Sequence, residues 1–179
     1  KWYKWDEAKE LIESGATGDH AENKWGGLNA YWIMKFENKT SLIDQLFPNE
    51  SQKSILFLKY YQEKLVLKNI EKIEKYFGRE EWIEKAEKDL ENKTNEQIEK
   101  DAEFYWRCKK GEWGKLKEVI KNGGRNYFVD QVGRTGIHWS AFWGEAGIVK
   151  MILEKEKFQI ERRNNFLTTL MGWAMEEEK

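Results

Sequence analysis

Apolar residues recur at helical spacing in the last third of the chain, and turn residues separate the segments that carry them. Residues 130–133 have turn chemistry, since their glycine can adopt a positive φ and their aspartate favours a turn. Thr135 stands where it can cap a short helix that begins near Gly136. Gly144 ends that helix after about two turns, and the apolar positions of 148–153 then repeat at intervals of three and four residues. The pattern predicts a helix, a tight reversal and a second helix.

A different pattern fills residues 48–100. The apolar stripe over 54–77 predicts one bent helix or two short ones. A second amphipathic helix is predicted over 79–90, and a third begins at Thr94, which has capping-box spacing to Gln97. Lys and Glu dominate the remaining faces, which is typical of solvated helix surfaces with i,i+4 pairs. We therefore predict a helical insertion or linker over 48–100.

Four tryptophans mark an internal repeat. Trp106 and Trp139 are 33 residues apart, Trp173 follows after 34 more, and Trp32 belongs to an earlier, less regular copy. A single helix–turn–helix unit cannot bury both of its faces, whereas stacked neighbours can. The repeat therefore predicts a one-dimensional array of helical hairpins. We expect this tryptophan position to pack between adjacent first helices rather than to contact a ligand.

The unit at 130–160 resembles an ankyrin repeat. Its Thr-Gly-Ile-His-Trp-Ser-Ala stretch, which starts at Thr135, is similar to the T-P-L-H-x-A-A core of that family, with Gly136 in place of proline. Residues 111–124 are similar to the second helix and following loop of such a repeat, and residues 8–16 resemble the same half.

This resemblance implies an all-α fold, in which an ankyrin-type array of helix–turn–helix repeats (an α-solenoid) carries a helical insertion. Degenerate repeats are expected over 1–47, where Glu37 stands at a position usually held by glycine. The insertion or linker occupies 48–100, and further repeats occupy 101–179.

The insertion has a weaker resemblance of its own. Residues 81–84 and 94–99 resemble the helical lid of the seventy-kilodalton heat-shock chaperones. A group of ciliary ankyrin-repeat proteins is similar in joining repeats to a lid-like helical segment. The alternatives are an idiosyncratic helical insertion and a repeat that has degenerated past recognition.

Composition narrows the classes of partner. The formal net charge of −1 gives no electrostatic reason to expect binding to nucleic acid or to an anionic membrane. No apolar run approaches the ~20 residues that span a bilayer, and the first residues do not form a signal peptide. The single cysteine, Cys108, allows no internal disulfide and suits a reducing, cytoplasmic compartment.

Residues for catalysis are scarce. The chain has two histidines, His20 and His138, and one cysteine, with no metal-ligand spacing and no phosphate-binding loop among them. Cys108 occupies the small-residue position that Ala141 holds in the next unit, so we expect it to be packed in a helix interface. The ankyrin resemblance implies that His138 hydrogen-bonds the backbone of the neighbouring hairpin. We predict that the protein is not an enzyme and has no cofactor.

The ankyrin resemblance also implies that the two residues before each helix-ending glycine face the concave side of the array. Aromatic and basic residues stand there, a composition that resembles a protein-binding hot spot, and residues at the turn tips would flank it. The candidate partner-binding residues are Lys35, Phe36, Lys109, Lys110, Phe142 and Trp143 on the concave face, and Lys24, Trp25, Gln131, Val132, Arg134, Asn165 and Phe166 at the tips. The alternative is that these aromatic residues cover the middle helices.

These features predict a non-catalytic scaffold that binds other proteins. Neither end of the sequence carries a complete polar cap, from which we expect either more chain or docking on a partner. That expectation favours a structural subunit of a hetero-oligomeric assembly, such as a ciliary axoneme or another cytoskeletal structure. The alternatives are a soluble, reversible adaptor and the regulatory ankyrin portion of a larger enzyme or channel.

Overall fold

The computed structural model describes Glu10, Ser14, residues 27–47 and residues 51–176. Within this part of the chain, all regular secondary structure is helical, which confirms the predicted all-α class. The ankyrin-type arrangement of these helices stays a prediction.

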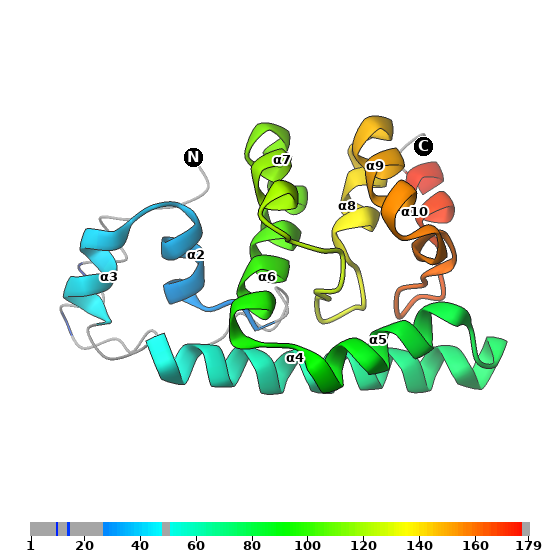
Figure 1. Ribbon diagram of the computed structural model, residues 1–179, viewed down its shortest axis with the longest axis horizontal. Helices are drawn as coiled ribbons and strands as arrows, with labels where there is room; N and C mark the ends of the chain where they lie inside the picture. Colours follow the sequence, from blue (N-terminus) through cyan, green and yellow to red (C-terminus); the bar gives the residue numbers. More distant parts are fainter. Residues whose placement is uncertain (1–9, 11–13, 15–26, 48–50, 177–179) are drawn as a thin grey trace.

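Pairs of helices joined by tight reversals stand side by side in Figure 1. The pairs are α2 (Ala30–Phe36) with α3 (Thr40–Leu46), α6 (Asn95–Lys110) with α7 (Trp113–Lys121), and α8 (Gly136–Phe142) with α9 (Ala146–Lys155). Gly111 and Gly144 make the last two reversals, with φ of +69° and +70°, a region that favours glycine. In the first pair Asn38 takes this role at φ +55°. Asparagine tolerates that conformation better than most residues, so the pair forms although Glu37 stands where glycine was expected.

Equivalent turns precede α8 and α10 (Leu170–Glu176). In the first turn the Asp130 N–H donates to the Arg134 carbonyl at 3.0 Å, and in the second the Asn164 N–H donates to the Thr168 carbonyl at 3.1 Å. These two hydrogen bonds are 34 residues apart, the spacing of the sequence repeat. The short 3-10 helix η2 (Lys157–Glu161) connects α9 to the second turn.

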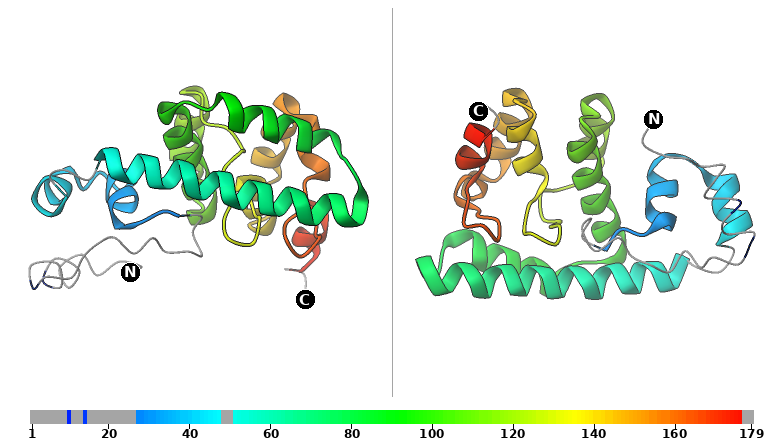
Figure 2. Two further views of the ribbon diagram at one scale, coloured as in Figure 1. Left: turned by 90° about the horizontal axis from the view of Figure 1, so that it is seen from below. Right: turned by 180° about the vertical axis from the view of Figure 1, so that it is seen from behind.

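The insertion forms two helices before α6. The apolar stripe forms one continuous helix, α4 (Ser51–Phe77), and α5 (Glu81–Asn92) follows it. The predicted third helix is α6, and its cap is confirmed, because the Gln97 N–H donates to the Thr94 hydroxyl at 3.1 Å. In Figure 1, α4 lies along the lower ends of the upright helices, and the view from behind in Figure 2 shows the same arrangement.

Buried polar residues on α4 fasten it to the hairpins. The Gln62 side chain pairs with both backbone groups of Val129: it donates to the carbonyl at 2.7 Å and accepts from the N–H at 3.0 Å. Seven residues later, Asn69 donates to the carbonyl of Arg163 at 3.3 Å and to the Asn165 side chain at 2.8 Å. Val129 and Arg163 are 34 residues apart, and seven residues of helix cover about 10 Å, which matches the usual 8–10 Å between packed helices. The described helices of the predicted insertion, α4 and α5, therefore pack across the hairpins rather than project from them.

The apolar core follows this plan. One cluster runs through the upright helices and includes Trp32, Trp106 and Ile137, all nearly inaccessible to solvent. A second cluster lies between α4 and α5 and includes Ile73 and Trp82. The Arg162 guanidinium lies over the Trp82 ring at 5.2 Å, and burial lowers the pKa of Arg162 to about 10. The insertion and the repeats thus share a common interior.

Candidate functional site

The recurring tryptophans lie on the first helix of each pair and on α10. Trp32, Trp106 and Trp139 are buried and Trp173 is half-buried, which agrees with the packing role expected for this position. The indole N–H of Trp32 donates to the Ser54 carbonyl at 3.4 Å. That of Trp106 donates to a Glu37 carboxylate oxygen at 3.0 Å. These tryptophans hold neighbouring helices together.

A cluster of aromatic rings joins α8 to α10. The Trp139 ring packs edge-on against Phe142 and Trp173, with centroids 5.6 and 6.4 Å away. Phe142 in turn contacts Trp143 at 5.4 Å and Trp173 at 5.9 Å. Lys109 Nζ and the Arg134 guanidinium carbon lie 4.2 and 4.5 Å from the Trp139 ring centroid, within cation–π range. We refer to Lys109, Arg134, Trp139, Phe142, Trp143 and Trp173 as the aromatic surface.

A buried hydrogen-bond chain supports the aromatic surface from beneath. The Trp139 indole donates to the Tyr105 hydroxyl at 3.2 Å, which donates to the Asp130 carboxylate at 3.0 Å. Asp130 also accepts from the side chain of Arg134 at 2.7 Å. Burial and the neighbouring Asp130 raise the pKa of Tyr105 well above its usual value, so its hydroxyl keeps the proton that it donates. These bonds fix the positions of Arg134 and Trp139.

Trp143 is the exposed member of the aromatic surface. The residue is 50% exposed, although its indole N–H donates to the Lys109 carbonyl at 3.3 Å. The ring is therefore presented to solvent in a fixed position at the C-terminal end of α8. This is the one exposed tryptophan among the residues that the structure describes.

The other concave-face candidates, on α2 and α6, are buried or interact with neighbouring side chains. Phe36 is only 4% exposed, so its ring is not available to a partner in this structure. Lys35 forms an ion pair with Glu99 at 2.6 Å, and the Lys110 ammonium lies 5.8 Å from the centroid of the Trp106 ring. Lys24 and Trp25 lie outside the described residues.

The turn-tip candidates form a separate group beside α4. Asn165 connects the two turns, since its side chain donates to the Gln131 carbonyl at 3.1 Å and its N–H donates to the Val132 carbonyl at 2.7 Å. Phe166, with 66% of its surface exposed, is the most accessible of these residues. Because Asn165 also contacts Asn69, this group is part of the fastening between α4 and the hairpins. Only Arg134 of these residues belongs to the aromatic surface.

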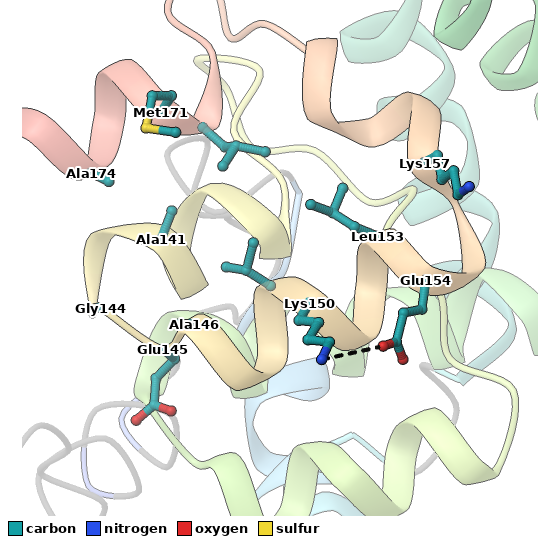
Figure 3. Close-up of a pocket in the computed structure, with 12 residues that line it drawn as sticks. Ala141, Gly144, Glu145, Ala146, Lys150, Leu153, Glu154, Lys157, Met171 and Ala174 are labelled. Carbon is teal, nitrogen blue, oxygen red and sulfur yellow. Dashed lines mark ion pairs between the residues drawn. The ribbon is translucent and has the colours of Figure 1, made fainter.

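An apolar groove lies at the edge of the array, where α8, α9 and α10 meet (Figure 3). Its volume is about 570 Å³. The apolar residues that line it are Ala141, Ala146, Val149, Leu153, Leu170, Met171 and Ala174. Glu145, Lys150, Glu154 and Lys157 stand among them, and Lys150 and Glu154 face each other at 3.9 Å. The sequence reasoning missed this groove, although the i, i+4 pair of Val149 and Leu153, each followed by a charged residue, was visible.

Of the three residues weighed for nucleophilic or acid–base chemistry, Cys108 and His138 are buried and His20 lies outside the described residues. Cys108 is inaccessible, and burial raises the pKa of its thiol to about 12. His138 is also inaccessible; burial lowers its pKa to about 3, and its Nδ1 accepts from the N–H of Thr135, the N-cap residue of α8. In the described part of the chain, no group of three or more His, Cys, Asp or Glu residues could hold a metal ion. None of the helices described here has the length and apolar character to cross a membrane.

Comparison with protein-family models and with curated proteins gives no significant match for this chain.

Proposed function

We propose that the protein is a non-catalytic interaction module that binds another protein through the aromatic surface. The observation that supports this proposal is Trp143, a half-exposed indole held against a cluster of rings and cations. Tryptophan and arginine are enriched at the energetic centres of protein interfaces, and such residues are surrounded by packed neighbours that exclude water.

The energetics favour a contact centred on Trp143. Covering the exposed half of a tryptophan removes roughly 100 Å² from water, which contributes about 2.5 kcal/mol. The ring is already oriented by its bond to the Lys109 carbonyl and by contact with Phe142, so little side-chain entropy is lost on binding. A partner that presents an apolar side chain to this ring would gain most from these features.

A second exposed surface supports membership of a larger assembly. Leu56, Tyr60 and Leu67 are exposed large side chains on α4, and their spacing of four and seven residues puts them on one side of the helix. Apolar side chains in such a row tend to be covered by a partner. We therefore favour a fixed subunit over a reversible adaptor, and we propose that the hairpins form the ankyrin-type array that the repeat predicts.

The test compares capture of proteins from the native source by the unmodified chain, by Trp143→Ala and by Tyr76→Ala. Tyr76 is the matched control, because it is an exposed aromatic residue near the C-terminal end of α4 and does not belong to the aromatic surface. We expect one or two proteins to be retained by the unmodified chain and by Tyr76→Ala and to be lost with Trp143→Ala. Equal retention by all three chains would sink the assignment of the aromatic surface.

A further inference from the structure

The apolar groove between α8, α9 and α10 has a counterpart inside the molecule. At the repeat offsets of 33 and 34 residues, Val149 corresponds to Leu116, Leu153 to Ile120, and Met171 to Ile137. Leu116 and Ile137 are completely buried, whereas Met171 is 63% exposed. The groove is therefore lined at the same repeat positions as an internal packing surface, but its Met171 is exposed where Ile137 is covered.

Helix α9 covers the internal counterpart. It contacts α8, and its Ile148 and Ile152 are buried in the same core cluster as Leu116, Ile120 and Ile137. Its Met151 and Ile120 of α7 line a small cavity between the two helices. These three residues of α9 have the i, i+3, i+4 spacing of one helix face. Inside the molecule, the equivalent surface is thus covered by a short amphipathic helix, α9, which lies beside α7 of the preceding pair.

We propose that the groove binds an amphipathic helix of a partner protein, which lies beside α9 as α9 lies beside α7. The apolar floor takes a face with i, i+3, i+4 spacing, as in helix-in-groove recognition generally. Charges of both signs border the floor: Lys150 and Glu154 form an ion pair on α9, Lys157 stands on η2, and Glu145 stands at the reversal between α8 and α9 (Figure 3). The partner helix is therefore expected to carry an acidic residue on the flank that faces Lys157.

This site is separate from the aromatic surface. None of the groove residues belongs to that surface, although both use α8 and α10. A partner can consequently occupy the groove while Trp143 contacts a different protein or a different part of the same one. The groove extends a packing interface that exists between the hairpins, and binding of a helix there does not depend on the proposed function.

The probe is a fluorescent peptide with the sequence of residues 145–156, stapled on its polar side because an isolated helix of this length is marginal in water. Its binding to the 179-residue chain is followed by fluorescence anisotropy. We expect saturable binding, weakened at least tenfold by Met171→Glu in the protein and by Ile152→Glu in the peptide. Met175→Glu is the matched control, since Met175 lies on α10 with the same 63% exposure but does not line the groove.

Three outcomes would overturn the proposal. The first is no binding to the unmodified chain while circular dichroism shows it to be folded. The second is equal binding by Met171→Glu, which would mean that the peptide displaces the protein's own α9 instead of entering the groove. The third is self-association that Met171→Glu abolishes, because the occupant would then be a second copy of this chain.

Discussion

Replacing Gln62 with leucine is expected to lower the free energy of unfolding by about 2–4 kcal/mol. The amide side chain of Gln62 makes two hydrogen bonds, at 2.7 and 3.0 Å, to the backbone of Val129, and both residues are buried. Leucine fills a similar volume but pairs with neither group, so a buried carbonyl and a buried N–H each lose a partner. Each loss costs about 1–2 kcal/mol, and the two add because they involve different groups.

Thermal and urea unfolding measure this change. For a chain of this length, a loss of about 3 kcal/mol corresponds to a decrease in Tm of roughly 6–12 °C. Hydrogen exchange should become faster in the turn that contains Val129, while α3 is unaffected. Lys59→Ala, an exposed change on the same helix, serves as the control and should leave Tm within about 1 °C. A loss below 1 kcal/mol would refute the view that α4 fastens the hairpins through Gln62.

Two further perturbations test the local physics. Gly144→Ala should lower the free energy of unfolding by about 1 kcal/mol, because φ at this position is +70°. Gly147→Ala, inside α9, should raise it by roughly 0.5–1 kcal/mol. Similar effects of the two changes in urea unfolding would contradict the assigned turn. The pKa of His138 is about 3 in the folded protein and about 6.5 when unfolded, so the unfolded chain binds more protons between these values and stability falls as the pH drops below 6.5. His138 should therefore lower the free energy of unfolding by about 2 kcal/mol at pH 5. The measurement is the difference in the pH dependence of stability between the unmodified chain and His138→Gln. Glutamine can still accept from the Thr135 N–H. Parallel pH profiles for the two chains would show that His138 is not the cause.

Much of the helical layout could be predicted from local chemistry. Gly144 acts as expected, because a reversal with positive φ needs glycine, and Thr94 caps α6 because its hydroxyl reaches the Gln97 N–H. The first pair was harder to predict, since the reversal has moved from Glu37 to Asn38. The residues of the aromatic surface were predicted only in part. Lys109, Phe142 and Trp143 were expected to lie together and Arg134 was expected at a turn tip, whereas Trp139 and Trp173 were assigned to packing alone.

The position of the insertion could not be predicted, because its fastening depends on contacts between residues far apart in the sequence. Gln62 and Val129 are 67 residues apart, and nothing in the periodicity of α4 identifies the turn that it contacts. A signal was nevertheless present. Gln62 and Asn69 are polar, buried and seven residues apart on one helix, which is the spacing needed to reach neighbouring packed hairpins.

The central claim is that the aromatic surface contacts a stable partner, and crosslinking mass spectrometry on native material tests it most directly. Lys109 and Lys110 end α6 next to Trp143, so they should crosslink to the same one or two neighbouring proteins in repeated preparations. Lys121, an exposed lysine at the end of α7, provides the comparison within the same protein. Crosslinks from Lys109 and Lys110 that stay within the chain, or that scatter over many proteins at low occupancy as those from Lys121 do, would contradict the claim.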